Sequence, residues 1–388
     1  MSKNYIPLAT PTLKGNELKY VKECIDTEWI SSAGKFVETF EHKIAKYTGS
    51  SFAVACVNGT SALQVSLRLA GVDYGDEVIV PTLTFIAPVN AIRYNGAAPI
   101  FMDTDNYYNI DAEKTIDFIK KQTNFKNGFT YNKLTNKKIS AIIPVHVWGN
   151  AVDLEELSLL CSERKIAIVE DSSESLGTVY TRGSLAGRHA GTIGSLGCLS
   201  FNGNKIITAG GGGAILTNNY KVARKAKYLT TQAKDDPVYY IHNEIGYNFR
   251  LTNIQAAIGV AQLEKLDEIL TCKKKINSKY DKLISEIEGL SLAPVPDYSN
   301  NNHWLNLLQI EKNSYGLNRD DLMLKLEKNN IQTRPVWGLN HFQKPFAHFQ
   351  NYKIENAQKL LKKSLCIPSS VNLNDDDINY IKKRLIEK

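Results

Sequence analysis

A single lysine stands where a strand-like segment turns into a flexible, glycine-rich segment. The apolar run Cys198–Phe201 leads into the turn 202–205, and four consecutive glycines follow at Gly210–Gly213. Glycine lets the backbone come close to a bulky ligand and adopt dihedral angles that other residues avoid. A lysine that is desolvated and held near an acid can lose its proton and attack a carbonyl carbon. Lys205 is therefore a candidate nucleophile, and the alternative is a solvated lysine in a surface loop.

A second candidate site is Asn58–Ala62, where a predicted strand turns into a predicted helix. The first turn of a helix presents unpaired N–H groups and the positive end of the helix dipole, and small residues such as Gly59 leave room for a phosphate. The alternative is an ordinary helix cap, because Asn, Ser and Thr often serve in that role. The segment matches neither GxGxxG nor GxxxxGK[ST], so neither dinucleotide nor P-loop binding is indicated.

An acidic pair, Glu170 and Asp171, follows the apolar run Ile166–Val169. Sheets of parallel strands bind their ligands at the carboxyl ends of the strands. An acid at that edge can hold the ring nitrogen of a pyridine cofactor protonated, which makes the ring an electron sink. The alternative is that Asp171 caps the next helix.

Length, composition and charge limit the number of domains and the kinds of ligand that the protein is expected to bind. With 388 residues, 43% of them hydrophobic, the chain can form two domains or one large α/β domain with an appendage. The net charge of +7 is spread along the sequence, which favours phosphorylated small molecules over dedicated nucleic-acid binding. His341 and His348 lack zinc-finger spacing and no cysteine pair accompanies them, so we expect no metal site.

The cysteines and the apolar runs indicate the compartment. The six cysteines are scattered without a CxxC pair, so we expect reduced core residues of a cytoplasmic protein. The first residues carry no apolar signal segment, and no later run reaches membrane-spanning length. We therefore expect no membrane partner.

Strand and helix patterns alternate through the first two thirds of the chain. The predicted strands are 53–57, 77–80, 99–102, 141–145 and 166–169, and the predicted helices are 15–26, 36–47, 60–70, 88–94 and 153–164. This alternation predicts a mostly parallel sheet covered by helices on both faces. The lysine-rich stretch 120–138 interrupts the pattern and is interpreted as a surface excursion.

The remaining third has a different rhythm. From Asn253 a helical pattern continues toward Ile287, which suggests one long helix bridging two domains. A strand at 305–310, a helix at 320–328 and helices near the end follow. We place a large α/β domain at 1–264 and a smaller C-terminal α+β domain at 265–388.

In their order and spacing these segments resemble the fold-type-I pyridoxal-phosphate enzymes, and more narrowly the DegT/DnrJ/StrS family of nucleotide-sugar aminotransferases. The resemblance covers nearly the whole chain. The matching segments are Trp29–Ser31 with Gly34, Pro81–Ala87 (PTLTFIA), Pro144–Gly149 (PVHVWG), Glu170–Asp171, Ser200–Lys205 (SFNGNK), Gly246–Leu251 (GYNFRL) and Thr333–Trp337 (TRPVW).

The resemblance implies a role for each candidate residue. Lys205 would hold pyridoxal 5'-phosphate as a Schiff base and later move a proton. Asp171 would lie on the pyridine nitrogen, and Glu174, where many relatives carry Gln, near the phenolic oxygen. The other implied cofactor contacts are Phe85 stacked on the ring, Gly59, Thr60 and Ser200 at the phosphate, and Asn248 donated by the neighbouring subunit of a homodimer.

Two further residues are candidates for the substrate. Arg334, beside Trp337, resembles a substrate-facing segment, and its alternative is a surface turn. His303 could contact the substrate, and His146 could equally be a packed core residue.

The family resemblance implies an enzyme that moves an amino group from glutamate to a nucleotide-linked keto sugar. The segments NGNKIIT and YNFRLTN most resemble enzymes of the bacillosamine and legionaminic acid type, so we expect amination at C4 of UDP-2-acetamido-2,6-dideoxy-hexos-4-ulose for bacterial surface glycans. The alternatives are 3-amination, a GDP-perosamine-type aminotransferase, and a cofactor-binding regulator. Relatives that deoxygenate GDP sugars have histidine in place of Lys205, and a regulator would need a DNA-reading module, of which we see no candidate.

Overall fold

The structure, a computed structural model, describes residues 5–387. Its largest element is an eight-stranded sheet with the strand order β1-β10-β9-β7-β6-β2-β3-β15. Strand β10 is antiparallel to both of its neighbours, and the other pairings are parallel. The strands are β1 (Phe52–Cys56), β2 (Glu77–Pro81), β3 (Ala98–Met102), β6 (Ile139–Ile142), β7 (Ala167–Asp171), β9 (Leu196–Ser200), β10 (Gly213–Thr217) and β15 (Asn351–Tyr352). The expected mostly parallel α/β sheet is confirmed.

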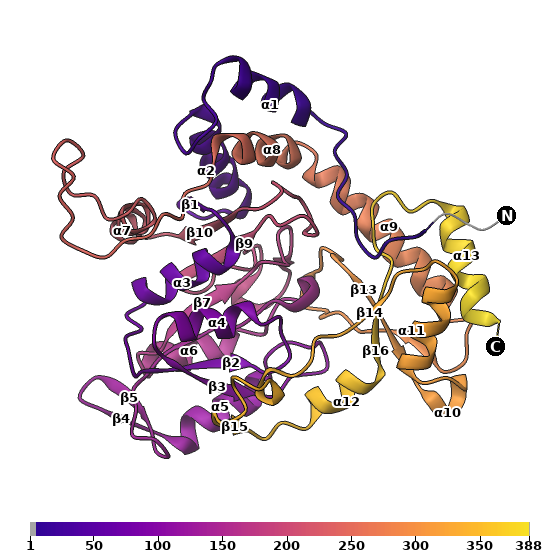
Figure 1. The fold of residues 1–388 in the computed structure, drawn as a ribbon. Helices are drawn as coiled ribbons and strands as arrows, with labels where there is room; N and C mark the ends of the chain where they lie inside the picture. Colours follow the sequence, from indigo (N-terminus) through magenta and orange to yellow (C-terminus); the bar gives the residue numbers. More distant parts are fainter. Residues whose placement is uncertain (1–4, 388) are drawn as a thin grey trace.

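Helices cover this sheet on both faces (Figure 1). Successive side chains of a strand point to opposite faces, and β2 follows this rule: Val78 and Val80 join one core, whereas Ile79 joins the other. The first core includes side chains of α2 (Lys35–Thr48), α3 (Gly59–Leu69), α4 (Ala87–Tyr94), α7 (Tyr220–Thr230) and α8 (Asn253–Leu263), and the second those of α5 (Ala112–Gln122) and α6 (Glu155–Glu163).

The C-terminal part builds a second, antiparallel sheet of four strands in the order β11-β13-β16-β14, seen in orange and yellow in Figure 1. Its core includes Tyr280, Leu322 and Ile381 from three helices. The elements are β11 (Leu290–Leu292), β13 (Asn306–Ile310), β14 (Arg334–Pro335), β16 (Ser364–Ile367), α9 (Leu266–Ile284), α11 (Arg319–Lys328) and α13 (Asp375–Ile386). The domain boundary at 264/265 stays a prediction; it falls between α8 and α9.

Shorter elements complete the chain. They are α1 (Glu17–Asp26), α10 (Lys312–Tyr315), α12 (Asn356–Lys363), the paired strands β8 (Val179–Tyr180) and β12 (Ser299–Asn300), and the 3-10 turns Val147–Gly149, Gly183–Leu185 and Asn340–Phe342.

The expectation of one long helix from Asn253 toward Ile287 was wrong. The chain forms α8 and α9, which are separated by Glu264 and Lys265. No glycine or proline marks this break in the sequence. The difference lies in packing: α8 buries residues on most of its surface, whereas α9 buries one stripe against the smaller sheet.

The lysine-rich stretch 120–138 contains a hairpin that the sequence analysis did not predict. Strand β4 (Thr123–Lys126) pairs with β5 (Phe129–Asn132). The two connecting residues, Asn127 and Gly128, both have positive φ angles, of 53° and 78°. Asn-Gly between two strands is a strong hairpin signal, so this element was present in the sequence and was overlooked.

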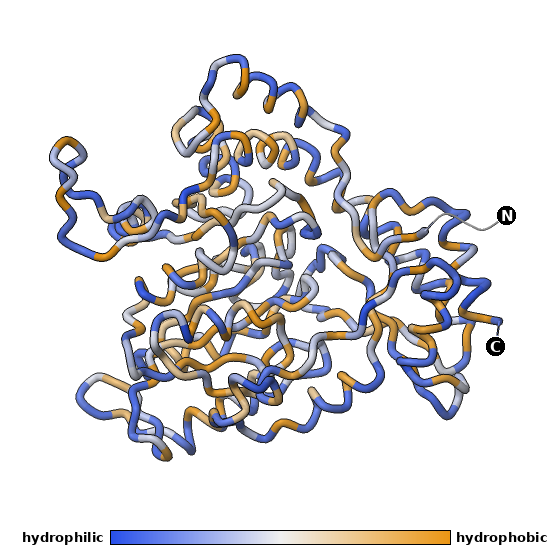
Figure 2. The backbone as a smooth tube through the Cα atoms, in the orientation of Figure 1, coloured by the Kyte–Doolittle hydropathy of each residue, from blue (hydrophilic) through white to orange (hydrophobic). Residues whose placement is uncertain are grey.

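Figure 2 shows apolar residues gathered along the central strands and polar residues along the outer loops and helices. Five of the six cysteines are buried, as expected of core residues, and Cys272 is exposed. Among the described residues, we find no helix that combines the length and the apolar character needed to cross a membrane.

Candidate active site

A cavity of about 440 Å³ lies where the carboxyl ends of several strands of the large sheet meet the C-terminal part. Its lining follows β1, β2, β7 and β9 in the chain, as expected for ligand sites in such sheets. The lining residues include Asn58, Gly59, Thr60, Thr84, Phe85, Trp148, Asp171, Ser173, Glu174, Ser200, Asn202, Asn204, Lys205, Trp304, Arg334, Trp337 and Cys366. Most of the candidates from widely separated segments are therefore brought together.

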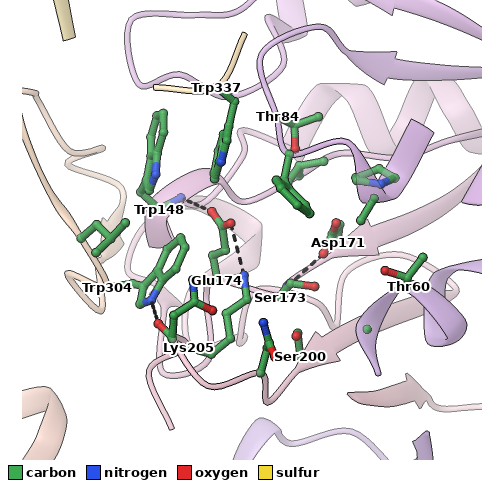
Figure 3. A pocket seen from close by; sticks show the side chains of 18 of the residues that line it. Thr60, Thr84, Trp148, Asp171, Ser173, Glu174, Ser200, Lys205, Trp304 and Trp337 are labelled. Carbon is green, nitrogen blue, oxygen red and sulfur yellow. Dashed lines mark hydrogen bonds and ion pairs between the residues drawn. The ribbon is translucent and has the colours of Figure 1, made fainter. Parts of the chain in front are cut away.

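Lys205 points into this cavity (Figure 3). Its N–H donates to the carbonyl of Asn202 at 3.0 Å, which closes the turn after β9. Its side chain is 14% exposed, and its Nζ lies 3.4 Å from Glu174 Oε1 and 4.4 Å from the centre of the Trp304 ring. The lysine is thus held inside the pocket and is not a solvated loop residue.

Asp171 ends strand β7 and is buried. Burial raises the pKa of this carboxyl, while the hydrogen bond from the Ser173 N–H to Oδ1 (3.0 Å) and the charge of Lys205 oppose the rise. The chain beyond Asp171 turns through 172–178 into strand β8, so the aspartate does not cap a following helix. A buried carboxylate at this place favours a cationic partner in the cavity.

Glu174 is the second buried carboxyl of the cavity. Glu174 Oε2 accepts a hydrogen bond from the main-chain N–H of Trp148 at 2.8 Å, and Oε1 faces the Lys205 amine. Burial raises the pKa of Glu174, and the charge of Lys205 opposes this rise. The glutamate and the Trp304 ring therefore both adjoin the lysine amine.

One end of the cavity is formed by the N-terminus of α3. Asn58 caps this helix by accepting the Ser61 N–H at 2.8 Å. A Cβ at Gly59 would come within 2.9 Å of the Ser200 Cβ and 3.2 Å of the Ser173 Oγ. Only glycine leaves this corner open, and the free N–H groups of a first helical turn there suit an anion.

The glycine run after the lysine has a geometric explanation. Gly210 and Gly212 have φ angles of 74° and 109°, which side chains rarely tolerate. A Cβ at Gly213 would come within 2.5 Å of the Asn58 carbonyl carbon. The run thus allows the chain to turn into β10 and to pass directly beside the start of α3.

A buried hydrogen-bond network around His146 and Glu170 lies next to Asp171. His146 Nδ1 accepts the Val152 N–H at 3.0 Å, so the ring proton lies on Nε2, which donates to Glu170 at 2.9 Å. The Glu170 carboxylate also accepts the N–H groups of Gly191, Ile193 and Gly194. Although burial raises the pKa of Glu170, the His146 hydrogen bond and these N–H groups lower it below its ordinary value. His146 is a core residue that fixes the end of β7.

Two candidates lie outside the cavity of their own chain. Asn248 is exposed on the segment between α7 and α8, where its backbone bridges to Thr231. His303 faces a separate small pocket behind Trp148, and burial lowers its pKa to about 4. The substrate role of His303 and the cross-subunit role of Asn248 stay predictions.

An aromatic wall completes the site. Trp148 and Trp337 stack with ring centres 4.7 Å apart and planes 10° apart, and Phe85 lies tilted 6.3 Å from Trp337. Arg334 lies at the same side of the cavity. Both stacked tryptophans belong to segments that carried the family resemblance, whereas Trp304 was missed because its sequence surroundings carry no motif.

The sequence is similar to known aminotransferases over nearly its whole length. The family model of the DegT/DnrJ/EryC1/StrS aminotransferases matches residues 11–386. The chain is 35% identical over 380 residues to the putative pyridoxal phosphate-dependent aminotransferase EpsN of Bacillus subtilis, covering 96% of this chain and 92% of that protein. It is 36% identical over 381 residues to the GDP-perosamine synthase of Escherichia coli O157:H7, covering 97% and 96%.

A solved structure agrees with these matches. The aminotransferase TlmJ of Streptoalloteichus hindustanus superposes with a TM-score of 0.86 at 25% identity, over 98% of both chains. The chain belongs to the DegT/DnrJ/EryC1/StrS aminotransferase family. It is a pyridoxal-phosphate-dependent enzyme, an aminotransferase of nucleotide sugars.

The residues of the cavity fit this cofactor. The open corner at Gly59 suits a phosphate, Asp171 supplies a buried carboxylate, and Lys205 supplies an amine. Within residues 5–387, no group of three or more His, Cys, Asp and Glu side chains is arranged to hold a metal ion.

Asp171→Asn keeps the shape of the side chain and can still accept the Ser173 N–H, but it removes the negative charge. We expect the cofactor to remain bound, as its absorbance will show, while kcat falls by orders of magnitude. Each tenfold loss corresponds to about 1.4 kcal/mol of transition-state stabilisation. The exposed Asp153→Asn is the matched control and should retain kcat. Wild-type turnover in Asp171→Asn would contradict the assigned role.

Proposed function

We propose that this enzyme transfers an amino group from glutamate to the C4 ketone of a nucleotide-linked 6-deoxy sugar. The observation that carries the proposal is the convergence of Lys205, Asp171 and the N-terminus of α3 on one cavity, in a chain of a nucleotide-sugar aminotransferase family. Each group has a distinct chemical task, and the three tasks match the parts of one cofactor.

The N-terminus of α3 would hold the phosphate end of the cofactor. The first turn of the helix and the hydroxyls of Thr60 and Ser200 would bind the phosphate, with Gly59 providing the space. Asp171 would hold the ring nitrogen protonated from its buried position, and Phe85 would lie against the ring. When bound, pyridoxal phosphate supplies the electron sink that makes proton transfer at the amino-bearing carbon feasible.

Lys205 would hold the cofactor covalently and then carry the proton. Its amine lies between Glu174 and the Trp304 ring, so the Glu174 carboxylate could accept a proton from the ammonium and return it later. The indole shields the amine from water on one side, and a desolvated amine is the more reactive base.

Arg334 and the aromatic wall suit the rest of the substrate. A guanidinium forms paired hydrogen bonds with oxygen-rich anions such as a diphosphate. Arg334 is exposed at the cavity rim, where its Nη1 donates to the adjacent Thr333 carbonyl at 2.9 Å. It would therefore contact the sugar or the diphosphate of the incoming substrate.

Two nucleotides are candidates. Similarity over nearly the full length to a GDP-perosamine synthase favours a GDP-linked sugar. The segments 202–208 and 247–253 favour the UDP-linked 2-acetamido-2,6-dideoxy-hexos-4-ulose predicted from the sequence. We give the GDP-linked sugar precedence because the support comes from nearly the whole chain rather than from two short segments.

A substrate panel separates these candidates. Purified protein is incubated with glutamate and GDP-, UDP- and dTDP-linked 4-keto and 3-keto sugars, and the products are identified by mass spectrometry. We expect a 4-amino product, with the highest kcat/KM for a GDP-linked 4-keto-6-deoxy sugar. Preference for a 3-keto sugar would defeat the C4 assignment.

The substrate contact of Arg334 has its own test. Arg334→Ala should raise KM for the sugar more than KM for glutamate. Arg182 is an exposed arginine outside the cavity, and Arg182→Ala should change neither KM.

We also propose a homodimer with shared active sites. The segment between α7 and α8 projects from the body of the molecule (Figure 1). Val238, Tyr239, Tyr240 and Ile245 on it are 72–79% exposed, and so many adjacent apolar side chains are typical of an interaction surface. Asn248, at the base of this segment, would reach the phosphate site of the neighbouring subunit.

Mixed dimers test the shared site. Lys205→Ala and Asn248→Ala alter different halves of one site, so each homodimer should be weak or inactive. A mixed dimer contains one intact site, and subunit exchange should therefore restore activity that neither parent shows. Lack of recovery, with exchange confirmed by mass spectrometry of tagged subunits, would argue against sharing.

A further inference from the structure

Lys273 is a buried lysine that none of the roles above uses. It lies on α9 and is 5% exposed. Its ammonium donates to the main-chain carbonyls of Trp304 at 2.8 Å and Ser369 at 2.5 Å. No carboxylate in the described part of the chain forms an ion pair with it, and burial lowers its pKa to about 7. Burying an amine is unfavourable unless hydrogen bonds compensate, so these two carbonyl contacts determine whether the arrangement is tolerated.

The first of these contacts leads directly to the active-site lysine. Trp304 is 3% exposed and is held at three points: its N–H donates to Asn302 Oδ1 at 2.9 Å, its indole N–H donates to the Asn204 carbonyl at 2.6 Å, and its carbonyl accepts from Lys273. The face of its ring lies over the Lys205 amine, with Nζ 4.4 Å from the ring centre (Figure 3).

The second contact joins another segment to the same point. The Ser369 Oγ accepts the Asn306 N–H at 2.9 Å, so Lys273 and Ser369 together fix residues 304–306. Asn302 in turn donates to the carbonyls of Glu174 and Leu176 at 2.8 and 2.9 Å. The tryptophan is thus held between the carboxylate segment of the pocket and α9.

We propose that Lys273 is a positioning residue for Lys205, because it fixes the main chain of Trp304, whose indole sets the place of the Lys205 amine. A long side chain with three N–H donors can satisfy two carbonyls from one helix position, which an apolar residue cannot do. The inference rests on the proposed role of Lys205 in holding the cofactor.

Lys273→Met tests this proposal, since it retains the length of the side chain and removes the ammonium. The readout is the pH dependence of the absorbance of the lysine-bound cofactor, together with kcat and KM. We expect the absorbance midpoint to shift and kcat to fall about tenfold to a hundredfold, because small misplacements of a reacting group have effects of that size. KM for the nucleotide sugar should change much less. Lys274→Met, at the exposed neighbouring position on α9, should leave all three values unchanged.

A merely structural lysine would give a different result. Lys273→Met would then lower the melting temperature but leave the absorbance midpoint and kcat as in the wild type, and the proposal would be overturned. Trp304→Leu removes the ring that meets Lys205, so Lys273 then has no indole left to position. The double variant Lys273→Met/Trp304→Leu should therefore lose less activity than the product of the two single-variant losses in kcat. Additive effects would also overturn the proposal.

Two further variants, Trp304→Leu and Lys205→Ala, complete the experiment. Should Lys273→Met not fold, Trp304→Leu alone decides, since an unchanged absorbance midpoint there would mean that the indole does not set the lysine. Lys205→Ala must lack the pH-dependent absorbance altogether. If that absorbance persists, the role of Lys205 is wrong, whereas its loss together with an unaffected Lys273→Met rejects the positioning proposal alone.

Discussion

The site depends on keeping three ionisable side chains, Lys205, Asp171 and Glu174, together in a cavity largely shielded from water. Burial raises the pKa of both carboxyls, and the positive charge of the lysine opposes that rise. Main-chain N–H groups of Ser173 and Trp148 satisfy one oxygen of each carboxylate. Such a group of charges is stable only when every member has a partner, so the strands that deliver them must end at fixed positions.

The C-terminal part of the chain completes the cavity and is tied to the large sheet beside it. Asn340 donates its side-chain N–H groups to the carbonyls of Thr82 and Thr84, at 3.2 and 2.8 Å. His341 shares a hydrogen bond of 2.6 Å with the Thr82 hydroxyl. These contacts join the segment that carries Trp337 to the loop that carries Phe85, so the two aromatic side chains are positioned together.

Sequence patterns predicted the parallel sheet because its strands are short apolar runs with helices between them. They also predicted the cavity residues after β1, β7 and β9, since strands of one direction bring their carboxyl ends to one edge. The break at Glu264 was not predictable from residue types, because packing and not a glycine or proline ends α8. The hairpin at Asn127–Gly128 carried a usable signal that the lysine content concealed.

Within the site, sequence similarity located most of the candidate residues that line the cavity, but not the residues that hold them in place. The ring of Trp304 meets the Lys205 amine, and Lys273 donates to the main-chain carbonyl of Trp304. A contact to a main-chain carbonyl leaves no residue pattern to detect. His303 was expected to contact the substrate; in the structure it lines a separate pocket, and its substrate role stays a prediction.

We propose that the Lys205 amine is the group that binds the cofactor. Reduction of the purified protein with borohydride, followed by proteolysis and mass spectrometry, tests it most directly. We predict that the reduced cofactor is found on the peptide containing Lys205 and that Lys205→Ala is not labelled. Labelling at another lysine, or undiminished turnover of Lys205→Ala, would show that Lys205 is not the cofactor-binding lysine.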